Sequence, residues 1–393
     1  MELVHLSDTH LGRNSSSGIE RKRDYARAFE SVIDDAVERD VEAVIHSGDL
    51  FDSPSPSIET LERTDETIQK LTDNGIPFIV IVGNHERKRS LQWVDFLSRN
   101  QDLRRLSRDP MVISDDEDEE QIVLYGIDAV RKPLWDSADF TLTAPSIDSQ
   151  TAPRMLFMHE LVSPPINKGI EDYELSEIVP RLKLDIDFLA LGDYHDPINE
   201  YVEEFSLETY YAGATERINR NDFTGETEPS YVLLTVEDNE VTYERVPVKY
   251  TRPYEYVTIE EMADKSISEV KSEIDGYTFD YKAGDPQVIL TLRGESGDIP
   301  SKELAEYIYR KGVLHVQVVD ERGRSDEFYE IDTDQLESES IDSMLSETVS
   351  SLNLSEVAQN IEDVVRDMEV SNNKIRDETN TLITDSIVEE DSN

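Results

Sequence analysis

The first 250 residues of the chain predict an α/β fold built from layers of helices and sheets. Short β-branched and aliphatic runs alternate there with stretches whose apolar residues recur at helical spacing, which is typical of α/β layers. The run at 77–82 (Pro-Phe-Ile-Val-Ile-Val) is apolar throughout, as expected for a strand that is covered on both faces. Polar side chains suited to metal binding directly follow several of these runs.

The elements can be taken in chain order. After a first strand at 3–6, apolar residues at helical spacing predict an amphipathic helix over about 20–39. A strand at 41–46 and a helix over 57–73, ended by Asn-Gly, come next. Further strands are expected at 77–82, 111–113, 122–125, 155–158 and 186–191, with a helix near 91–106 and a hairpin at 231–236 and 241–246. Six consecutive carboxylates, at 115–120, predict a solvated hairpin loop.

The pattern changes near residue 251, which predicts three domains: 1–250, 251–331 and 332–393. The middle domain is expected to be a small α+β unit with the order strand, helix, strand, helix, strand, strand. Glycine and proline are absent after residue 332, and three weakly amphipathic helices fit there. Because that stretch has too little apolar surface for a core of its own, we expect its apolar stripes to dock on a partner.

The chain is strongly acidic. Lys plus Arg number 38 and Asp plus Glu number 87, a formal net charge of −49. An acidic partner-binding tail is one explanation, but the acidic residues occur in all regions, which favours adaptation to high salt. Such a charge normally argues against a nucleic-acid partner. In molar salt the repulsion of phosphate is screened within a few ångströms, so this objection loses most of its force.

Composition also excludes several classes of protein. The chain has no cysteine, so disulfides, thiolate catalysis and cysteine-based zinc sites are excluded. It begins with a strand, shows no signal-peptide pattern, and has no apolar run near the roughly 18 residues that a membrane span needs. We therefore expect a soluble, cytoplasmic protein.

Metal-ligating side chains gather in the predicted strand-end loops, which share one edge of an α/β sheet. Four of the seven histidines are among them. A mixed nitrogen and oxygen set of this size is too large for one zinc ion and fits two divalent metals. Two metals about 3.5–4 Å apart stabilise the attacking and leaving oxygens of a phosphoryl displacement. The set is Asp8, His10, Asp49, Asn84, His85, His159, Asp193 and His195, with Asp49 as the expected bridge between the ions.

These residues occur in motifs that resemble those of the calcineurin-like metallophosphoesterases. The motifs are Asp8-x-His10, Gly48-Asp49, Gly83-Asn84-His85-Glu86, His159 and Gly192-x-x-His195. Finer features resemble the SbcD-type nuclease family of double-strand-break repair: residues 7–12, 48–52, 171–173 (Glu-Asp-Tyr) and 213–217 (Gly-Ala-Thr-Glu-Arg). The resemblance covers residues 1 to about 250 closely and the rest more loosely.

The resemblance implies a four-layer α/β/β/α sandwich with a small α+β cap domain and a helical C-terminal tail. It also implies two ions, usually Mn²⁺, although other divalent ions are possible. One ion is expected on Asp8, His10, Asp49 and His195, and the other on Asp49, Asn84, His159 and the residue at position 193. His85 is the implied catalytic residue, which contacts the scissile phosphate and protonates the leaving oxygen.

The sequence departs from the family pattern at two positions. Asp193 stands where the family usually has histidine. A carboxylate can still bind manganese, but it adds negative charge facing the phosphate, which lowers activity, changes the metal preference or turns Asp193 out of the site. Glu86 stands where aspartate is commoner, and we expect it to lie behind the ligands.

Other polar residues near the motifs have two possible roles. The basic residues in or beside the motif loops are expected to contact phosphate rather than only solvent: Arg13, Arg87, Lys88, Arg89 and Arg217. Asp52 either orients the substrate or caps a turn. We expect His5, His46 and His315 to be packed or supporting residues rather than ligands.

The family resemblance therefore implies a Mn²⁺-dependent DNA phosphodiesterase with 3′–5′ exonuclease and endonuclease activity. Its implied partners are DNA, a coiled-coil ABC-type repair ATPase bound by the C-terminal helices, and a second copy of the chain, contacted near 91–106. Two alternatives stay open: a metallophosphoesterase acting on small phosphodiesters or phosphoproteins, and a weakly active or inactive scaffold that dimerises and regulates the ATPase.

Overall fold

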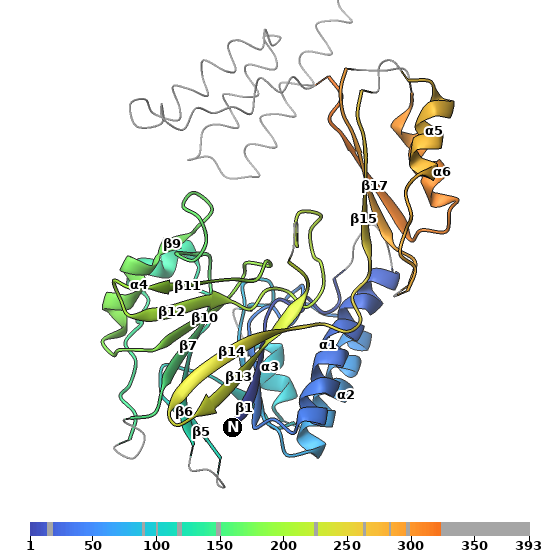
Figure 1. Cartoon of the computed structure of the whole chain (residues 1–393). Coiled ribbons are helices and arrows are strands. Elements are labelled where there is room, and N and C mark those ends of the chain that lie inside the picture. The colour runs from blue at the N-terminus through green and yellow to red at the C-terminus, as the bar shows by residue number, and fades with distance from the viewer. Residues whose placement is uncertain are drawn as a thin grey trace, which may run out of the picture. The chain divides into compact units, whose positions relative to one another are not determined.

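In a computed structural model of the chain, two six-stranded sheets lie face to face (Figure 1). The structure describes residues 1–323, apart from 14–18, 89–90, 100, 116–119, 147–150, 224–226, 262–264, 283 and 296–298. The chain divides into two units, Met1–Gly323 and Arg324–Asn393. The predicted tail helices fall outside the described residues.

The first sheet has the order β14-β13-β1-β2-β3-β4. Its first four strands in the chain are parallel, and a C-terminal hairpin continues the sheet antiparallel to β1. The strands are β1 (Glu2–Leu6), β2 (Ala43–Ser47), β3 (Phe78–Ile81), β4 (Leu103–Arg105), β13 (Ser230–Glu237) and β14 (Glu240–Pro247).

The second sheet has the order β11-β12-β10-β7-β6-β5. Four inner strands are parallel and both edge strands are antiparallel to their neighbours. Its strands are β5 (Met111–Ser114), β6 (Gln121–Ile127), β7 (Arg154–His159), β10 (Phe188–Gly192), β11 (Ile198–Val202) and β12 (Leu207–Tyr211). The short strands β8 (Val162–Ser163) and β9 (Tyr173–Glu174) pair separately.

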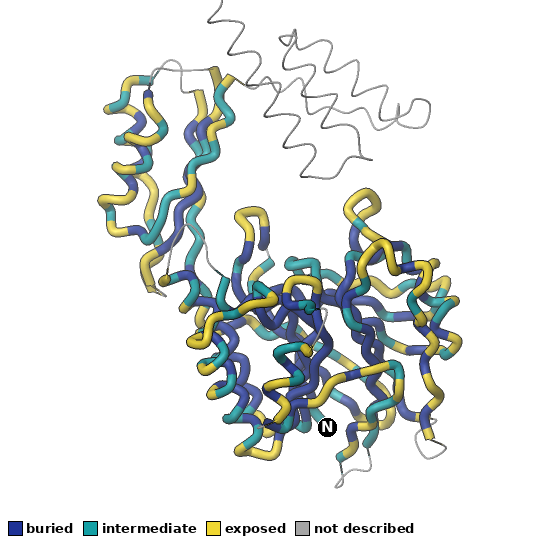
Figure 2. The backbone as a smooth tube through the Cα atoms, turned by 180° about the vertical axis from the view of Figure 1, so that it is seen from behind, coloured by how far each residue is buried: buried dark blue, intermediate teal, exposed yellow. Residues whose placement is uncertain are grey.

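Helices cover the outer faces of both sheets. The first sheet packs against α1 (Ile19–Arg39), α2 (Ile58–Asp73) and α3 (Trp93–Leu97). The second packs against α4 (Leu175–Leu182) and the 3₁₀ helix η1 (Lys132–Ser137). A third apolar cluster lies between the sheets. The inner strands of both sheets are largely buried, whereas the edge strands are mostly exposed or partly buried (Figure 2). The predicted four-layer α/β/β/α sandwich is confirmed.

Local sequence explains the two long helices. The apolar residues that predict α1 are buried against the sheet, Phe29 and Ile33 among them. Helix α2 begins where Ser57 accepts a hydrogen bond from the Thr60 amide, and it ends at Asn74. Both ends follow the residue preferences of helix caps.

The helix expected near 91–106 is wrong in extent. Of the described residues in that range, only the five of α3 are helical, and residues 103–105 form β4. The reason is pairing with β3, because the Phe78 amide donates to the Asp102 carbonyl and the Leu106 amide to that of Val80. Leu103 and Leu106 are buried in the apolar clusters.

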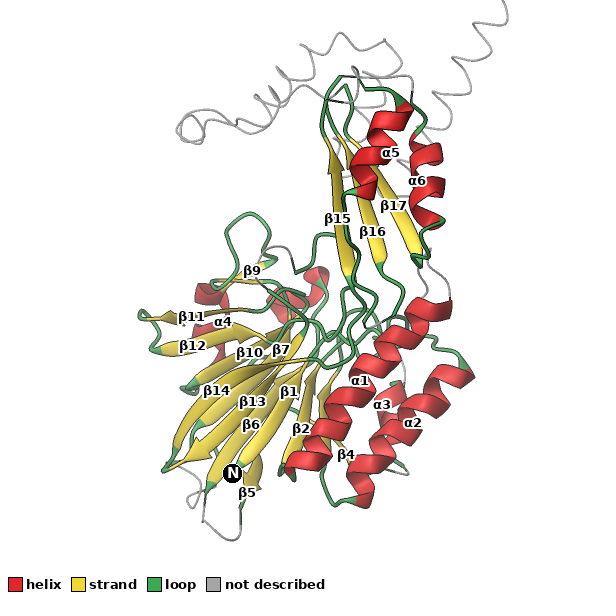
Figure 3. Cartoon of the chain, turned by 45° about the vertical axis from the view of Figure 1, so that its right-hand side comes forward, coloured by secondary structure: helices red, strands yellow, loops and turns green. Residues whose placement is uncertain are grey.

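A second α/β arrangement follows β14. Three parallel strands, in the order β15-β16-β17, pack against two helices around a separate apolar cluster (Figure 3). The elements are β15 (Tyr254–Ile259), α5 (Ile267–Asp275), β16 (Gln287–Leu292), α6 (Ser301–Tyr309) and β17 (His315–Asp320). The sixth element predicted from sequence would fall after Gly323, outside the described residues.

A buried ionic network ties the segment before β15 to helix α1. The Arg252 guanidinium donates to both carboxylate oxygens of Asp24, at 2.8 Å to Oδ1. Its backbone amide donates to Glu216, which also pairs with Arg21 at 3.2 Å. All four side chains are buried, so each charge is offset by a partner, as burial demands.

No helix of the described residues is long and apolar enough to cross a membrane.

We predict that Asp35→Asn destabilises the sandwich by about 1–2 kcal/mol at pH 7. Burial raises the pKa of Asp35, but hydrogen bonds from Arg39, Lys249 and Tyr231 outweigh it and lower the pKa to about 2. A lowered pKa contributes stability above the unfolded value near 4, and that contribution is lost as the pH falls toward 2. Denaturant unfolding in molar KCl at several pH values measures it.

The matched control is Asp34→Asn. Asp34 pairs with Lys70 but is 55% exposed, and exposed pairs contribute about 0–1 kcal/mol. Equal destabilisation by the two variants, or a loss for Asp35→Asn that persists unchanged into acid, would contradict the prediction.

Candidate metal centre

The carboxyl ends of five strands from both sheets meet at one edge, as predicted: β1, β2, β3, β7 and β10. Backbone hydrogen bonds join the first two strand-end loops, from the Asp8 amide to the Gly48 carbonyl at 3.2 Å and from the His10 amide to the Asp49 carbonyl at 3.0 Å. Because the backbones are locked together, the side chains of the two loops face one another.

Four of the predicted ligands form a tight buried cluster. The His159 Nε2 atom lies 3.4 Å from Asp49 Oδ2 and 3.9 Å from Asp8 Oδ1. The His10 Nε2 atom lies 3.6 Å from the same Asp49 oxygen and 3.8 Å from Asp8 Oδ1. The Asp49 carboxylate therefore lies between the two imidazoles, where a bridging ligand would have to be.

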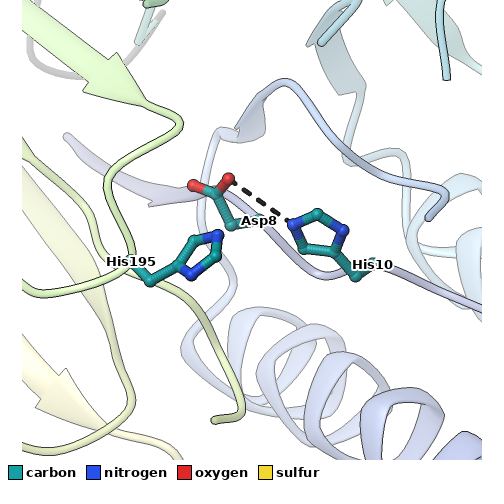
Figure 4. A group of neighbouring side chains, drawn as sticks. All are labelled: Asp8, His10 and His195. Carbon is teal, nitrogen blue, oxygen red and sulfur yellow. Dashed lines mark ion pairs between the residues drawn. The ribbon is translucent and has the colours of Figure 1, made fainter. Parts of the chain in front are cut away.

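His195 lies beside this cluster. Its ring is 5.5 Å from that of His10, and Figure 4 shows both imidazoles on either side of Asp8. One ligand atom from each of Asp8, His10 and His195 lies within 4.8 Å of the others, and the same holds for Asp8, Asp49 and His159. Among the described residues a third such group consists of His10, Asp52 and His85, so three overlapping groups of possible ligands meet here.

The backbone at these positions is unusual. Asp8, His10, Asp49 and Asp193 all have positive φ, between 43° and 88°, a region that residues other than glycine seldom adopt. Such strain concentrates at functional sites, where surrounding structure holds it in place. The turns it creates follow three strands, β1, β2 and β10, and direct their ends toward the same point.

Two glycines make room for His159. A Cβ atom added to Gly48 or to Gly192 would overlap the His159 ring, and at Gly192 it would also overlap Ser7 and Ser47. The two sheets approach closely enough here only because these positions carry no side chain.

Each clustered imidazole has an acceptor behind it. The His10 Nδ1 atom lies 3.1 Å from Asp52 Oδ1, and the His159 Nδ1 atom lies 2.8 Å from the Ser47 carbonyl oxygen. The His195 Nδ1 atom lies 3.2 Å from Asp222 Oδ2. Acceptors of this kind place the ring proton on Nδ1 and leave the Nε2 lone pair free, as in metal-bound histidines.

The Nε2 atoms of His10 and His159 are buried and have no hydrogen-bond partner among the residues that the structure describes. Buried polar atoms are normally paired, so two orphaned nitrogens aimed at shared carboxylates call for an additional group. Imidazole nitrogen and carboxylate oxygen suit divalent cations. The residues present therefore fit the metal ions that the sequence implies.

The buried charges perturb one another. Burial raises the pKa of Asp49, but the positive charge of His159 outweighs this and holds the pKa well below its usual range. Burial lowers the pKa of His159, yet Asp49 and Asp8 raise it well above the usual value. The pKa of Asp193 is raised by burial and by the same two carboxylates. A divalent cation would relieve this excess of negative charge.

Asp193 points into the cluster rather than out of it. Its Oδ1 atom lies 3.7 Å from His159 Nε2 and accepts a hydrogen bond of 3.0 Å from the side-chain Nδ2 of Asn84. Its backbone amide donates to Asp8 at 3.2 Å. The carboxylate is thus held where the family usually has an imidazole.

Two neighbours of Asn84 have distinct environments. The His85 side chain is 44% exposed, while its backbone amide donates to Asp49 at 2.9 Å, so the ring stands at the open side of the cluster. Glu86 is buried and accepts from the Gly83 and Phe51 amides. Burial and the charge of Asp49 raise its pKa to about 7.

The residues predicted to contact phosphate are placed differently. Arg13 donates to Asp52 at 2.7 Å and is partly exposed at the rim. Lys88 lies over the Trp93 ring at 3.7 Å, and Arg89 lies outside the described residues.

Two further arginines make intramolecular contacts. Arg87 donates to the Ala129 carbonyl. Arg217 donates to the Phe223 carbonyl and to the Tyr256 hydroxyl, at 3.1 Å and 2.8 Å, and its guanidinium lies over Tyr254.

The remaining histidines are outside the cluster. His5 is buried between the Tyr210 hydroxyl and Ser47, and His46 contacts the Thr9 hydroxyl. His315 lies in β17. Burial lowers the pKa of all three.

Sequence reasoning missed Asp222, the acceptor behind His195, because it belongs to no motif and lies 27 residues away in the chain. It also missed Glu160, which follows His159 and is buried beside the Val130 amide. Burial raises the pKa of Glu160 to about 8.

Comparison with known proteins agrees with this geometry. Residues 1–197 match the family model of the calcineurin-like phosphoesterases. The chain belongs to this family. Its relatives indicate which group within the family it belongs to. A DNA double-strand break repair protein Mre11 of Haloferax volcanii is 30% identical over 390 residues, which cover 99% of this chain and 82% of the relative. This phosphoesterase thus belongs with the Mre11 proteins, so the predicted SbcD-type resemblance and halophilic kinship are confirmed.

Coverage of the relatives differs. The Mre11 protein of Methanosarcina mazei is 30% identical over 387 residues, which cover 96% of this phosphoesterase but only 59% of that relative. Among solved structures, a dimetal phosphatase from Danio rerio has a TM-score of 0.40 at 10% identity, covering 62% of this chain and 95% of that one. We draw no argument from a likeness of that size.

We predict that Gly192→Ala displaces His159 and weakens manganese binding at least tenfold, with a loss of about 1–3 kcal/mol in stability from overpacking. Titration of the full chain with Mn²⁺ and thermal unfolding measure the two effects. Gly276→Ala is the matched control, because Gly276 ends α5 with a φ of −73° that alanine also adopts. Unchanged manganese binding in Gly192→Ala would show that the His159 ring does not need this space.

Proposed function

We propose that this phosphoesterase is a metal-dependent DNA phosphodiesterase of double-strand-break repair. The observation that carries the proposal is the buried cluster in which Asp8 and Asp49 face the unpartnered Nε2 atoms of His10 and His159. A buried carboxylate–imidazole set at a strand-end edge is a scaffold for phosphoryl-transfer metals. The relatives named for DNA double-strand break repair supply the substrate class.

Two sets of side chains would hold the ions. We propose Asp8, His10, Asp49 and His195 as one set, and Asp49, Asn84, His159 and Asp193 as the other. The proximity of Asp8, His10 and His195 supports the first set, and the contacts of Asp193 with His159 and Asn84 support the second. Manganese is our proposal for both, because it accepts carboxylate, amide and imidazole ligands together. When bound, such ions stabilise the negative charge that develops on the phosphate.

His85 is the proposed catalytic residue. Its exposed ring stands at the open side of the cluster, with Nδ1 3.2 Å from the Asp52 carbonyl. When both ring nitrogens are protonated, Nδ1 donates to that carbonyl and the proton on Nε2 can pass to a leaving oxygen. Its backbone amide holds Asp49 at the same time, so the proton donor and the bridging carboxylate are positioned together.

The rim of the site suits a phosphate chain only in concentrated salt. Arg13 lies there in a pair with Asp52, whereas the chain as a whole carries a net charge of −49. Repulsion of DNA acts over about 10 Å at 0.1 M salt but only about 3 Å at 1 M. The proposed 3′–5′ exonuclease and endonuclease activities therefore require molar salt.

The partners are also proposals. We assign residues 1–250 to hydrolysis, 251–331 to a DNA-binding cap and 332–393 to docking on a coiled-coil ABC-type ATPase. A second copy of the chain is proposed to bind near α3, where Leu91 and Phe96 are exposed.

A scaffold with weak catalysis is the second candidate, and Asp193 favours it. A third carboxylate beside Asp8 and Asp49 adds negative charge at the point where phosphate must bind. Burial raises its pKa most, and the two neighbouring carboxylates raise it further against the opposite effect of His159. In this alternative the chain dimerises and regulates the ATPase. A third possibility is that the protein hydrolyses only small phosphodiesters. An assay that compares DNA with a small ester distinguishes this possibility from the other two.

We predict that the wild type, in molar KCl with Mn²⁺, cuts plasmid and linear duplex DNA as well as bis-p-nitrophenyl phosphate. His85→Ala should lower DNA cleavage 10²–10⁴-fold, the usual contribution of a general acid, while its manganese content stays unchanged. His315→Ala, a histidine outside the cluster, is the matched control.

Adding Asp193→His to the same assay tests the alternatives. A wild type as inactive as His85→Ala, with activity restored by Asp193→His, would favour the scaffold. Hydrolysis of the small ester alone would remove DNA as the substrate.

We predict that deletion of the residues after 332 leaves hydrolysis of bis-p-nitrophenyl phosphate intact and abolishes binding of the ATPase. The apolar stripes of that stretch are the proposed docking surface, and the cluster of ligands lies wholly before residue 196. A pull-down with the purified ATPase is the measurement, and retained binding would show that the assignment is wrong.

A further inference from the structure

A loop after β12, residues 213–223, packs against the segment that carries His195. The Ala214 amide donates to the His195 carbonyl at 2.8 Å, and the Phe223 amide donates to the Asp196 carboxylate. The loop is therefore attached on both sides of one proposed metal ligand.

Within this loop the carboxylate of Asp222 is held rigidly. Its Oδ2 atom accepts hydrogen bonds from the Ile218 amide at 3.0 Å and the Asn219 amide at 2.6 Å. The side chain is almost fully buried. Two backbone donors on one oxygen leave the carboxylate no freedom to rotate away.

The same oxygen lies 3.2 Å from His195 Nδ1. A carboxylate can only accept, so the ring nitrogen carries the proton and Nε2 keeps its lone pair. That places the donor nitrogen on the side of Asp8 (Figure 4). The side-chain Nδ2 atom of Asn219 also lies 3.3 Å from Nδ1.

We infer that Asp222 is a positioning residue for His195: it fixes the ring orientation and the tautomer that metal binding requires. The inference rests on the proposed function for the identity of the metal set, but not on any nuclease activity. A buried carboxylate behind a ligand imidazole makes it a stronger donor, and removing such a partner typically costs 10–100-fold in metal affinity.

The chain offers a matched control for the loop itself. Asp196 accepts from the Phe223 amide, so Asp196→Asn weakens a charge-assisted hydrogen bond of the same loop without removing the acceptor behind His195. Asp222→Asn keeps the shape of the side chain but loses its charge and presents an amide to the two backbone donors.

The test is calorimetric titration of the full-length protein with Mn²⁺ in molar KCl. Asp222→Asn is expected to weaken one of the two ions by about 10–100-fold and to leave the other within about threefold, while Asp196→Asn leaves both unchanged. Unchanged affinities in Asp222→Asn would overturn the inference. An equal loss in both variants would also overturn it, because packing of the loop would then suffice.

A measurement on the wild type keeps the inference testable if Asp222→Asn does not fold. In the zinc-loaded protein with ¹⁵N-labelled histidine, long-range ¹H–¹⁵N spectra should show the His195 proton on Nδ1. A proton on Nε2 would overturn the assignment. A protein that binds metal as expected but cuts no DNA would refute the proposed function and leave this inference standing.

Discussion

The metal centre depends on one close contact between the two sheets. His159, at the end of β7, is hydrogen bonded through Nδ1 to the Ser47 carbonyl at the end of β2 in the other sheet. Gly48 and Gly192 leave the space in which this contact forms. Since the imidazole and the Asp49 carboxylate come from different sheets, the cluster can exist only in the assembled sandwich, and any residue that separates the sheets there also separates the ligands.

The positions of the clustered side chains at strand ends could be predicted from the sequence. Parallel strands deliver the residues after them to a common edge of their own sheet, which predicts Asp8 near Asp49 in one sheet and His159 near Asp193 in the other. The face-to-face packing of the sheets then brings the two edges together. The number of histidines in such positions then predicts a shared metal site. The sequence could not specify the strained backbone of Asp8 and Asp193, which arises from loops locked across the two sheets.

Other features had no local signal. Asp222 reaches His195 from a separate loop, and a lone acidic residue in a chain with 87 of them does not stand out. Arg217 and Arg87 donate to backbone carbonyls, which every residue possesses and no pattern reveals. The helix expected near 91–106 gave way to β4 because tertiary pairing with β3 outweighed helical spacing.

The buried network around Arg252 has a consequence for how this acidic molecule experiences its environment. Surface pairs such as Lys70 with Asp34 are open to ions and weaken as salt rises. The pairs of Arg252 with Asp24 and of Arg21 with Glu216 are buried, so dissolved ions do not reach them. Lowering the salt concentration therefore changes the interactions between charges on the exposed surface. It barely changes the buried ion pairs that join α1 to the segment before β15.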